Sequence, residues 1–470
     1  MAKKSIKTVQ LNITGVGHKG MAIGRTPEGM VVFVKGGIPG QKALVSLSKK
    51  RKGVWQGRIE EILEASIHEV PAFCSHFGIC GGCSWQSLDY VEQLRQKEIL
   101  VRDALIRIAK VDQTSFEPIL AAPDVKHYRN KLEFTFSTHR WLTREEIDDD
   151  QTNLNKNALG FHRPESFDKV VDINRCYLQD EISNLIRNEV RSYALEKGLS
   201  FYDIRTHSGL LRNMIIRTNL KGEVMLVLSA SENDGEKLSP LFEHLQTQFP
   251  RIISAHLAIN IKKNDSWFDL ECKKIFGTDA LPESLDHVNF NIGPKSFFQT
   301  NTLQTVNLYK LIEEYAQLSG GEIVYDVYCG VGSIGIFLAR HASKVIGIEE
   351  IPAAIVDAHK NAQLNQLDNL VFHTGDARTL LNDEMVLKYG VPDVLIVDPP
   401  RVGLHPEVVQ SILKFAPKRI IYVSCNPATQ ARDMAIMNEA YWVKKIRPVD
   451  MFPHTNHVEA VALLEWKSNS

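Results

Sequence analysis

The sequence predicts a multidomain α/β protein that begins with a small β-barrel, continues with an α+β region and ends in an α/β domain built on a parallel sheet. Three observations support this prediction. The chain has 470 residues, 44% of them hydrophobic, which suits two to four domains at about 100–200 residues each. Short β-like runs separated by glycines fill the first part, and strands alternate with helices in the last third. We therefore expect domains at residues 1–62, 63–290 and 291–470.

The N-terminal region is expected to form a small barrel that binds a polyanion. The whole chain has a formal net charge of −1, but residues 1–60 hold twelve Lys and Arg against two acids, which makes +10 here and −11 in the remainder. The basic run 49–52 lies close to Trp55 in the sequence, and RNA-binding barrels combine cations with aromatics in this way. The alternative is a solvated hairpin tip. Binding is favoured because the positive charge extends over the whole region.

The central region combines a helix with longer strands and carries a distinctive group of cysteines. Helical spacing runs from Tyr90 to Ala109, and the acidic segment from Glu145 to Asn157 is expected to be a surface loop. Three cysteines lie close together and a fourth is distant: Cys74, Cys80, Cys83 and Cys176. Four thiolates could hold a 4Fe-4S cluster or zinc, and this spacing fits a cluster better than the paired arms of zinc sites. Burial without a metal is the third alternative.

The last third has the pattern of a Rossmann-like domain. Runs of valine and isoleucine alternate with helical segments, which predicts a parallel sheet covered on both faces. A glycine-rich loop from Asp326 to Gly335 follows one strand, and Glu349 ends the next strand, where a carboxylate normally binds ribose hydroxyls. A nicotinamide-dependent dehydrogenase would also fit this loop. The motif Asp398-Pro-Pro-Arg401 at the end of a third strand is typical of S-adenosylmethionine methyltransferases and favours that class over a dehydrogenase. The alternative for the motif itself is an Asp-Pro turn that merely ends a strand, and the presence of both motifs on successive strand ends disfavours it.

Two further residues supply a candidate nucleophile and a candidate base. Cys425 follows a fourth strand, at the edge where open α/β sheets bind ligands, and Glu459 precedes the terminal strand. Each has an ordinary alternative, because free cysteines are more often buried packing residues and a lone glutamate is usually solvated. Methylation of uracil needs both groups: a thiolate adds to carbon 6, carbon 5 becomes nucleophilic, and a base then removes the carbon-5 proton. Amine methylation needs neither.

Five motifs, in this order, resemble the signatures of the RNA uracil-5-methyltransferase family. They are Ser-Phe297-Phe-Gln299-Thr-Asn, Asp-Val-Tyr328-Cys-Gly-Val-Gly, Asp398-Pro-Pro-Arg, Ser-Cys425-Asn-Pro and Met-Phe-Pro-His-Thr-Asn-His-Val-Glu459. The resemblance implies that Cys425 is the nucleophile and Glu459 the base, and that Phe297 lies near the flipped uridine. It implies four contacts to S-adenosyl-L-methionine, from Gln299, Tyr328, Glu349 and Asp398.

The resemblance also points to the branch of this family that acts on 23S ribosomal RNA. The basic N-terminal region resembles the TRAM domain, an RNA-binding barrel of that branch, and the four cysteines resemble its 4Fe-4S cluster motif. We therefore expect a cytoplasmic, monomeric 23S rRNA (uracil-5-)-methyltransferase that does not bind membranes. The alternatives are the same chemistry on transfer RNA, a dehydrogenase, and a non-catalytic RNA-binding or assembly protein that retains the fold.

Overall fold

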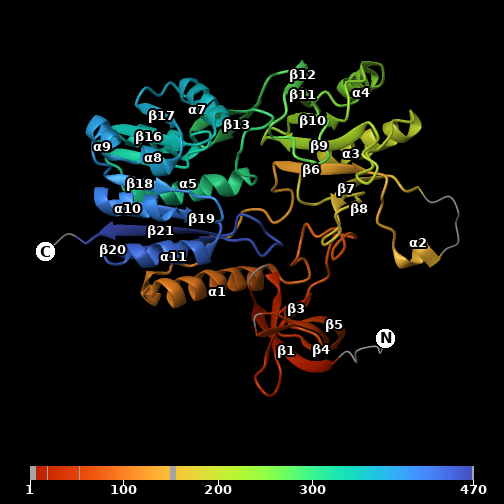
Figure 1. The fold of residues 1–470 in the computed structure, drawn as a ribbon, viewed down its shortest axis with the longest axis horizontal. Helices are drawn as coiled ribbons and strands as arrows, with labels where there is room; N and C mark the ends of the chain where they lie inside the picture. The colour runs from red at the N-terminus through yellow and green to blue at the C-terminus, as the bar shows by residue number, and fades with distance from the viewer. Residues whose placement is uncertain (1–6, 18–19, 52, 149–154, 468–470) are drawn as a thin grey trace.

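The computed structural model describes residues 7–17, 20–51, 53–148 and 155–467, which form three parts (Figure 1). A small barrel lies at the N-terminal end, a seven-stranded sheet with two helices forms the middle part, and a second seven-stranded sheet forms the C-terminal part. Lys52 of the basic run and residues 149–154 of the acidic loop lie outside the described residues. Within the described ranges, none of the helices combines the length and the apolar character needed to cross a membrane.

Five strands close the barrel in the order β1-β2-β3-β5-β4, as the short strands and glycine turns predict. Leu11, Ile13, Val32, Val34 and Val45 fill its interior. β3 and β5 pair in parallel, and this contact closes a barrel whose other pairs are antiparallel. The strands are β1 (Thr8–Val16), β2 (Ala22–Arg25), β3 (Val31–Lys35), β4 (Lys42–Arg51) and β5 (Val54–Glu64).

The middle part is a sheet in the order β12-β11-β10-β9-β6-β7-β8, with α3 and α4 packed on one face. The acidic segment does connect two strands, and the short helix α2 forms at its start. Its elements are β6 (Lys131–Ser137), α2 (Arg144–Asp148), β7 (Ala158–His162), β8 (Val170–Asp172), α3 (Glu181–Glu196), β9 (Leu211–Thr218), β10 (Val224–Ala230), α4 (Gly235–Gln248), β11 (Ile252–Ile259) and β12 (Cys272–Gly277). The hairpin β13 (Leu281–Leu285) and β14 (Val288–Ile292) leads to the last part.

The helix α1 (Tyr90–Ala109) has the bounds that the sequence predicts, and the Asp89 side chain caps its N-terminus. It packs with the C-terminal part and not with the middle sheet. Val101 and Leu105 belong to the core formed by that second sheet, and α1 lies beside α11 in Figure 1. The chain then passes through η2 (Gln113–Ser115) on its way to β6.

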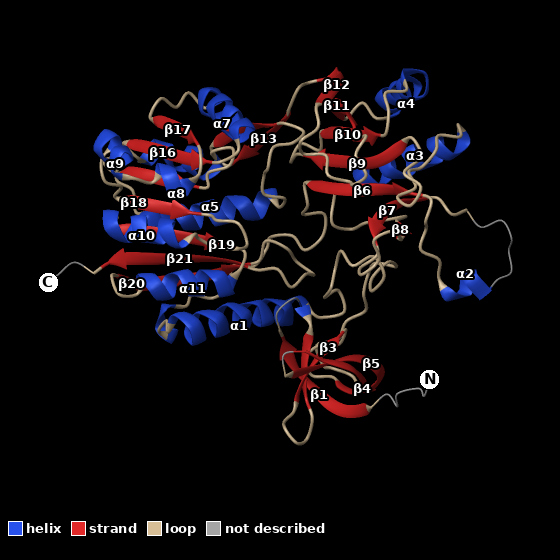
Figure 2. Cartoon of the chain, viewed as in Figure 1, coloured by secondary structure: helices blue, strands red, loops and turns tan. Residues whose placement is uncertain are grey.

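The C-terminal sheet has the order β17-β16-β15-β18-β19-β21-β20; the first five strands are parallel, and β21 is antiparallel to both its neighbours. Helices cover both faces, as predicted (Figure 2). The strands are β15 (Ile323–Val327), β16 (Lys344–Glu349), β17 (Leu370–Thr374), β18 (Val394–Val397), β19 (Arg419–Ser424), β20 (Tyr441–Val449) and β21 (Glu459–Trp466). The helices are α5 (Thr302–Ala316), α6 (Ser333–Leu338), η3 (Ala339–His341), α7 (Pro352–Leu364), α8 (Ala377–Leu380), α9 (Asp383–Tyr389), α10 (Pro406–Phe415) and α11 (Pro427–Met437).

Candidate active site

The C-terminal sheet gathers five of the predicted site residues along one edge. Glu349 is the last residue of β16, Tyr328 follows β15, Asp398 follows β18 and Cys425 follows β19. Glu459 begins β21, which runs in the opposite direction, so its first residue lies at the same edge. The order of these strands in the sheet is β16, β15, β18, β19 and β21. A row of side chains therefore runs from the expected ribose carboxylate to the expected base.

Cys425 and Glu459 are brought together by the pairing of β19 with β21. Ser424 lies opposite Ala460 in this ladder, so the residue after the first strand and the residue before Ala460 are neighbours. Burial raises the pKa of the Cys425 thiol to about 11, and the charges of Glu459 and Asp398 act in the same direction. The nearby Arg401 side chain lowers that pKa through its charge and a hydrogen bond. The thiol thus lies between two acids and one cation.

Glu459 is a buried carboxyl group, 7% exposed. Burial, helped by the charge of Asp398 and opposed by that of Arg401, raises the pKa of Glu459 to about 8. Burial also raises the pKa of Asp398 to about 7. A carboxylate with such a pKa is a stronger base than a solvated glutamate, which suits proton abstraction near neutral pH.

At the other end of the row, Glu349 and Asp326 bind the backbone of the glycine-rich loop. Glu349 accepts hydrogen bonds from the backbone N–H groups of Gly330 (3.0 Å) and Ile351 (2.9 Å). Asp326 is fully buried, and its Oδ2 accepts one from Gly335 N–H at 2.9 Å. Its Oδ1 has no hydrogen-bond partner in the described part of the chain. Burial raises the pKa of Asp326 to about 7. Such a site suits a ligand that carries positive charge and hydroxyl groups.

Gln299 lies apart from this row, in the loop between β14 and α5. Its backbone oxygen accepts a hydrogen bond of 2.9 Å from the Asn130 side chain of the middle part. Asn301 Nδ2 donates to Met451 O at 3.1 Å, which fixes the loop to the segment before β21. Phe297, in the same loop, is 70% exposed, whereas Phe298 is buried. The exposed ring is available to an incoming base.

The segment before Glu459 is held by residues that sequence reasoning did not single out. Lys97 of α1 is completely buried; its Nζ donates to Asp450 Oδ1 at 2.5 Å and to Phe452 O at 2.9 Å. The Gln93 side chain accepts a hydrogen bond from His454 N–H at 2.8 Å. The sequence did carry a signal for this pair, because Lys97 lies on the same helical face as Val101 and Leu105. A charge buried on an apolar face requires a partner of opposite charge.

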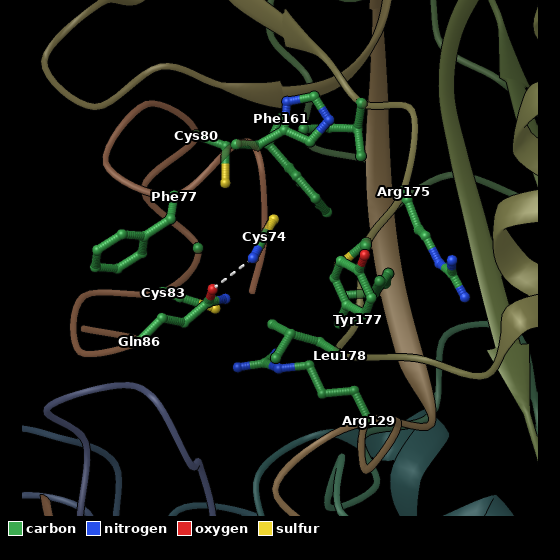
Figure 3. A pocket seen from close by; sticks show the side chains of 15 residues that line it. Cys74, Phe77, Cys80, Cys83, Gln86, Arg129, Phe161, Arg175, Tyr177 and Leu178 are labelled. Atoms are coloured by element: carbon green, nitrogen blue, oxygen red, sulfur yellow. Dashed lines mark hydrogen bonds between the residues drawn. The ribbon is translucent and has the colours of Figure 1, made fainter. Parts of the chain in front are cut away.

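The four cysteines of the middle part line one cavity of about 150 Å³. Cys74, Cys80 and Cys83 come from the loop between β5 and α1, and Figure 3 shows this loop facing Tyr177 and Leu178. Cys176 precedes α3, where the Asn184 side chain bonds both its backbone N–H (2.8 Å) and its C=O (3.0 Å). The cysteines thus converge from segments about a hundred residues apart.

Burial and the proximity of the other thiols raise the pKa values of three of these cysteines. The pKa of Cys83 rises to about 12, and those of Cys80 and Cys176 also rise. Within the described ranges, no group of three or more His, Cys, Asp or Glu side chains is arranged so that it could hold a metal ion.

Comparison with known proteins gives matches along the whole chain. Residues 244–467 match the family described as tRNA (Uracil-5-)-methyltransferase, and residues 3–68 match the TRAM domain. An uncharacterized RNA methyltransferase of Bacteroides thetaiotaomicron is 46% identical over 96% of this chain and 99% of its own length. A second, from Porphyromonas gingivalis, is 44% identical over 97% of this chain and 99% of its own length.

One solved structure is similar over almost the full length. It is the Pyrococcus abyssi tRNA (uracil-54, C5)-methyltransferase in complex with S-adenosyl-L-homocysteine, with a TM-score of 0.75 and 29% identity. The match covers 97% of this chain and 100% of that chain, so it includes the barrel as well as both sheets.

Proposed function

Because the chain belongs to a family of RNA methyltransferases and its residues 244–467 match the tRNA (Uracil-5-)-methyltransferase family, we propose that it methylates carbon 5 of a uridine in RNA and takes the methyl group from S-adenosyl-L-methionine. The pairing of β19 with β21 supports this proposal, because it brings the Cys425 thiol close to the Glu459 carboxyl group. A dehydrogenase would have no use for that pair.

In the proposed reaction, the Cys425 thiolate forms a bond to carbon 6 of the uracil, and the resulting enolate makes carbon 5 nucleophilic. Bound S-adenosyl-L-methionine supplies the methyl group to carbon 5. Glu459 then takes the carbon-5 proton, the double bond between carbons 5 and 6 forms again, and Cys425 leaves as a thiolate. Arg401 favours the thiolate electrostatically. The uridine has to leave its base stack to reach Cys425, and exposed Phe297 is our candidate to contact it.

We assign the contacts to S-adenosyl-L-methionine to Gln299, Tyr328, Glu349 and Asp398. The donor set fits this group: the cosubstrate has ribose hydroxyls that carboxylates accept, and its sulfonium and ammonium charges would be attracted to the acidic row. The unpartnered Oδ1 of Asp326 adds a buried acceptor behind the glycine loop. Support for the ligand itself comes from the S-adenosyl-L-homocysteine bound by the P. abyssi enzyme.

For the cysteine cavity we propose a 4Fe-4S cluster held by Cys74, Cys80, Cys83 and Cys176. Four thiols around one cavity fit such a group. The spacing of the cysteines, three close together and one distant, favours a cluster over a zinc site built on paired Cys-x2-Cys arms. Bound there, it would cross-link the loop before α1 to the segment before α3. Iron, sulfide and zinc contents after anaerobic purification test this assignment, and zinc without iron would refute it.

The RNA substrate proposed from the sequence is 23S ribosomal RNA, for a monomeric enzyme in the cytoplasm. Transfer RNA is the second candidate, because the P. abyssi enzyme acts on uridine 54 of tRNA and its match includes the barrel. The presence of a TRAM domain therefore does not by itself separate the two substrates. Methylation assays with 23S rRNA and tRNA transcripts, followed by mass spectrometry of the products, decide between them.

Covalent trapping tests the proposed function directly. RNA that carries 5-fluorouridine should form a denaturation-resistant complex with the protein and S-adenosyl-L-methionine, because fluorine cannot leave as a proton does. Cys425→Ala should abolish this complex. Cys272→Ala is the matched control, since Cys272 lies in β12 of the middle sheet and not in the C-terminal sheet that carries Cys425. No complex with either candidate RNA and folded, cosubstrate-bound protein would contradict the mechanism.

A further inference from the structure

A cationic groove lies between the barrel and the middle part, outside the site described above. Its volume is about 710 Å³. Arg58 of β5 forms one wall, and Ile79 of the loop between β5 and α1 forms another. The opposite side consists of residues 140–143, Ile147 of α2, and Arg163 and Lys169 of the turn between β7 and β8. Neither the residues assigned to methyl transfer nor the four cysteines line it.

The groove keeps an excess of positive charge. Arg140 is occupied, because it pairs with Glu146 at 2.8 Å and donates to Asn155 O at 2.8 Å. Arg58, Arg163 and Lys169 form no ion pair with any carboxylate of the described residues. Three cations from two different parts of the fold therefore face one groove.

The acids nearest in the chain to Arg163 and Lys169 form their ion pairs with other cations. Glu165 pairs with Lys35 of β3 at 2.9 Å, and Asp168 pairs with Arg205. Lys35 lies opposite Arg58 in the β3–β5 ladder, so the first of these pairs ties the barrel to the same turn that carries the groove's cations. Because this ion pair is exposed, it orients the two walls more than it stabilises them.

The groove also offers a stacked aromatic surface. The Arg163 guanidinium lies 3.8 Å from the centre of the Trp141 ring, and its Nε atom is buried without a hydrogen-bond partner among the described residues. The Trp141 backbone N–H donates to Val170 O at 2.7 Å, which anchors the residue to β8. Trp141 and Arg163 thus form a flat pair of the kind on which unpaired bases stack.

We propose that this groove binds a single-stranded segment of the substrate RNA, with phosphates at Arg58 and Lys169 and a base on the Trp141–Arg163 pair. The inference rests on the proposed function, since the occupant is the RNA that the active site would methylate. A single strand is favoured over a duplex because duplex bases stack on one another and cannot reach an aromatic wall. The enzyme would then hold its RNA at a second position, away from the reacting uridine.

Binding to defined RNA probes tests the groove without any methyl transfer. The probes are a labelled single-stranded oligouridylate and a duplex RNA of equal length. The double variant Arg58→Gln/Lys169→Gln should bind the oligouridylate more weakly, and the slope of log affinity against log salt should fall by about 0.7 for each lost cation. Trp141→Leu should weaken binding about fivefold or more with an unchanged slope, because stacking is not ionic.

The control variant is Lys388→Gln, an exposed lysine of α9 at the opposite end of the molecule (Figure 1). It should bind as the wild type does, and duplex binding should change little in all variants. Wild-type affinity and slope in the double variant would overturn the inference, and so would equal losses for duplex and single strand. If Trp141→Leu does not fold, the double variant Arg58→Gln/Lys169→Gln still decides, because Arg58 is exposed and Lys169 is half-buried.

Kinetics separate this inference from the proposed function. With methylatable RNA, the groove variants should raise KM for RNA and leave kcat within about twofold of the wild type. A fall in kcat with unchanged KM would overturn the inference. The protein could methylate no uridine while its groove variants still lose oligouridylate binding. That result would refute the proposed function and leave the groove assignment standing.

Discussion

Replacing Glu459 by glutamine should stop the reaction after methyl transfer and leave the RNA attached to Cys425. Glutamine has the size and shape of glutamate, so it fits this buried position, but it cannot accept the carbon-5 proton. General bases contribute about 100- to 10,000-fold to such steps, and release of methylated RNA should slow by that factor. Attack by Cys425 should persist, because the Glu459 charge raises the pKa of the thiol and the substitution removes it.

The assay is gel electrophoresis of protein incubated with unmodified RNA and labelled S-adenosyl-L-methionine. Glu459→Gln should give a denaturation-resistant band that carries the label, whereas the wild type should release methylated RNA. Glu465→Gln, further along the same strand and partly exposed, serves as the control and should behave as the wild type does. Turnover by Glu459→Gln within about tenfold of the wild-type rate would show that another group removes the proton.

Four further predictions follow from the charges of the site and its support. Between pH 6 and 8, kcat/KM should rise with pH, because Glu459 must be ionised and its pKa is about 8; a flat profile of initial rates would contradict this. The unfolded chain ionises Glu459 at its ordinary pKa of 4.5, whereas the folded protein keeps the proton up to about pH 8. The free energy of unfolding of the wild type should therefore fall relative to that of Glu459→Gln as pH rises from 4.5 through 8, by roughly 1–3 kcal/mol in urea unfolding. S-adenosyl-L-methionine should release protons on binding near pH 7, since its positive charge favours ionised Asp398; calorimetry in two buffers should show the release in wild type and a smaller one in Asp398→Asn. Lys97→Met should cost about 3–5 kcal/mol by leaving Asp450 buried and unpaired, and Lys97→Met/Asp450→Leu should recover part of that loss in the same unfolding assay.

The sequence was most informative where local patterns determine structure. The helix Tyr90–Ala109 was predicted with its observed bounds, because the spacing of its residues is a local signal. Its partner was not predictable. Spacing identifies an apolar face but not the surface that covers it, and here that surface comes from the C-terminal part.

The candidate site divides in the same way. Strand ends with the expected motifs indicated Asp398, Cys425 and the other edge residues before their positions were known. The proximity of Cys425 to Glu459 depends on β21 pairing with β19, and pairing between distant strands leaves no local signature in the sequence. Arg401 stood in a quoted motif, but its influence on the thiol required the folded geometry.

The burial of Lys97 against Asp450 also has a consequence for synthesis on the ribosome. These partners are 353 positions apart. Val101 and Leu105 of the same helix pack against strands that are synthesised much later. A nascent chain would therefore expose an apolar helix stripe until nearly all 470 residues have been translated. Truncated products should retain the barrel but lack β21, which carries Glu459. The helix would most need protection from aggregation in the period before the C-terminal strands are made.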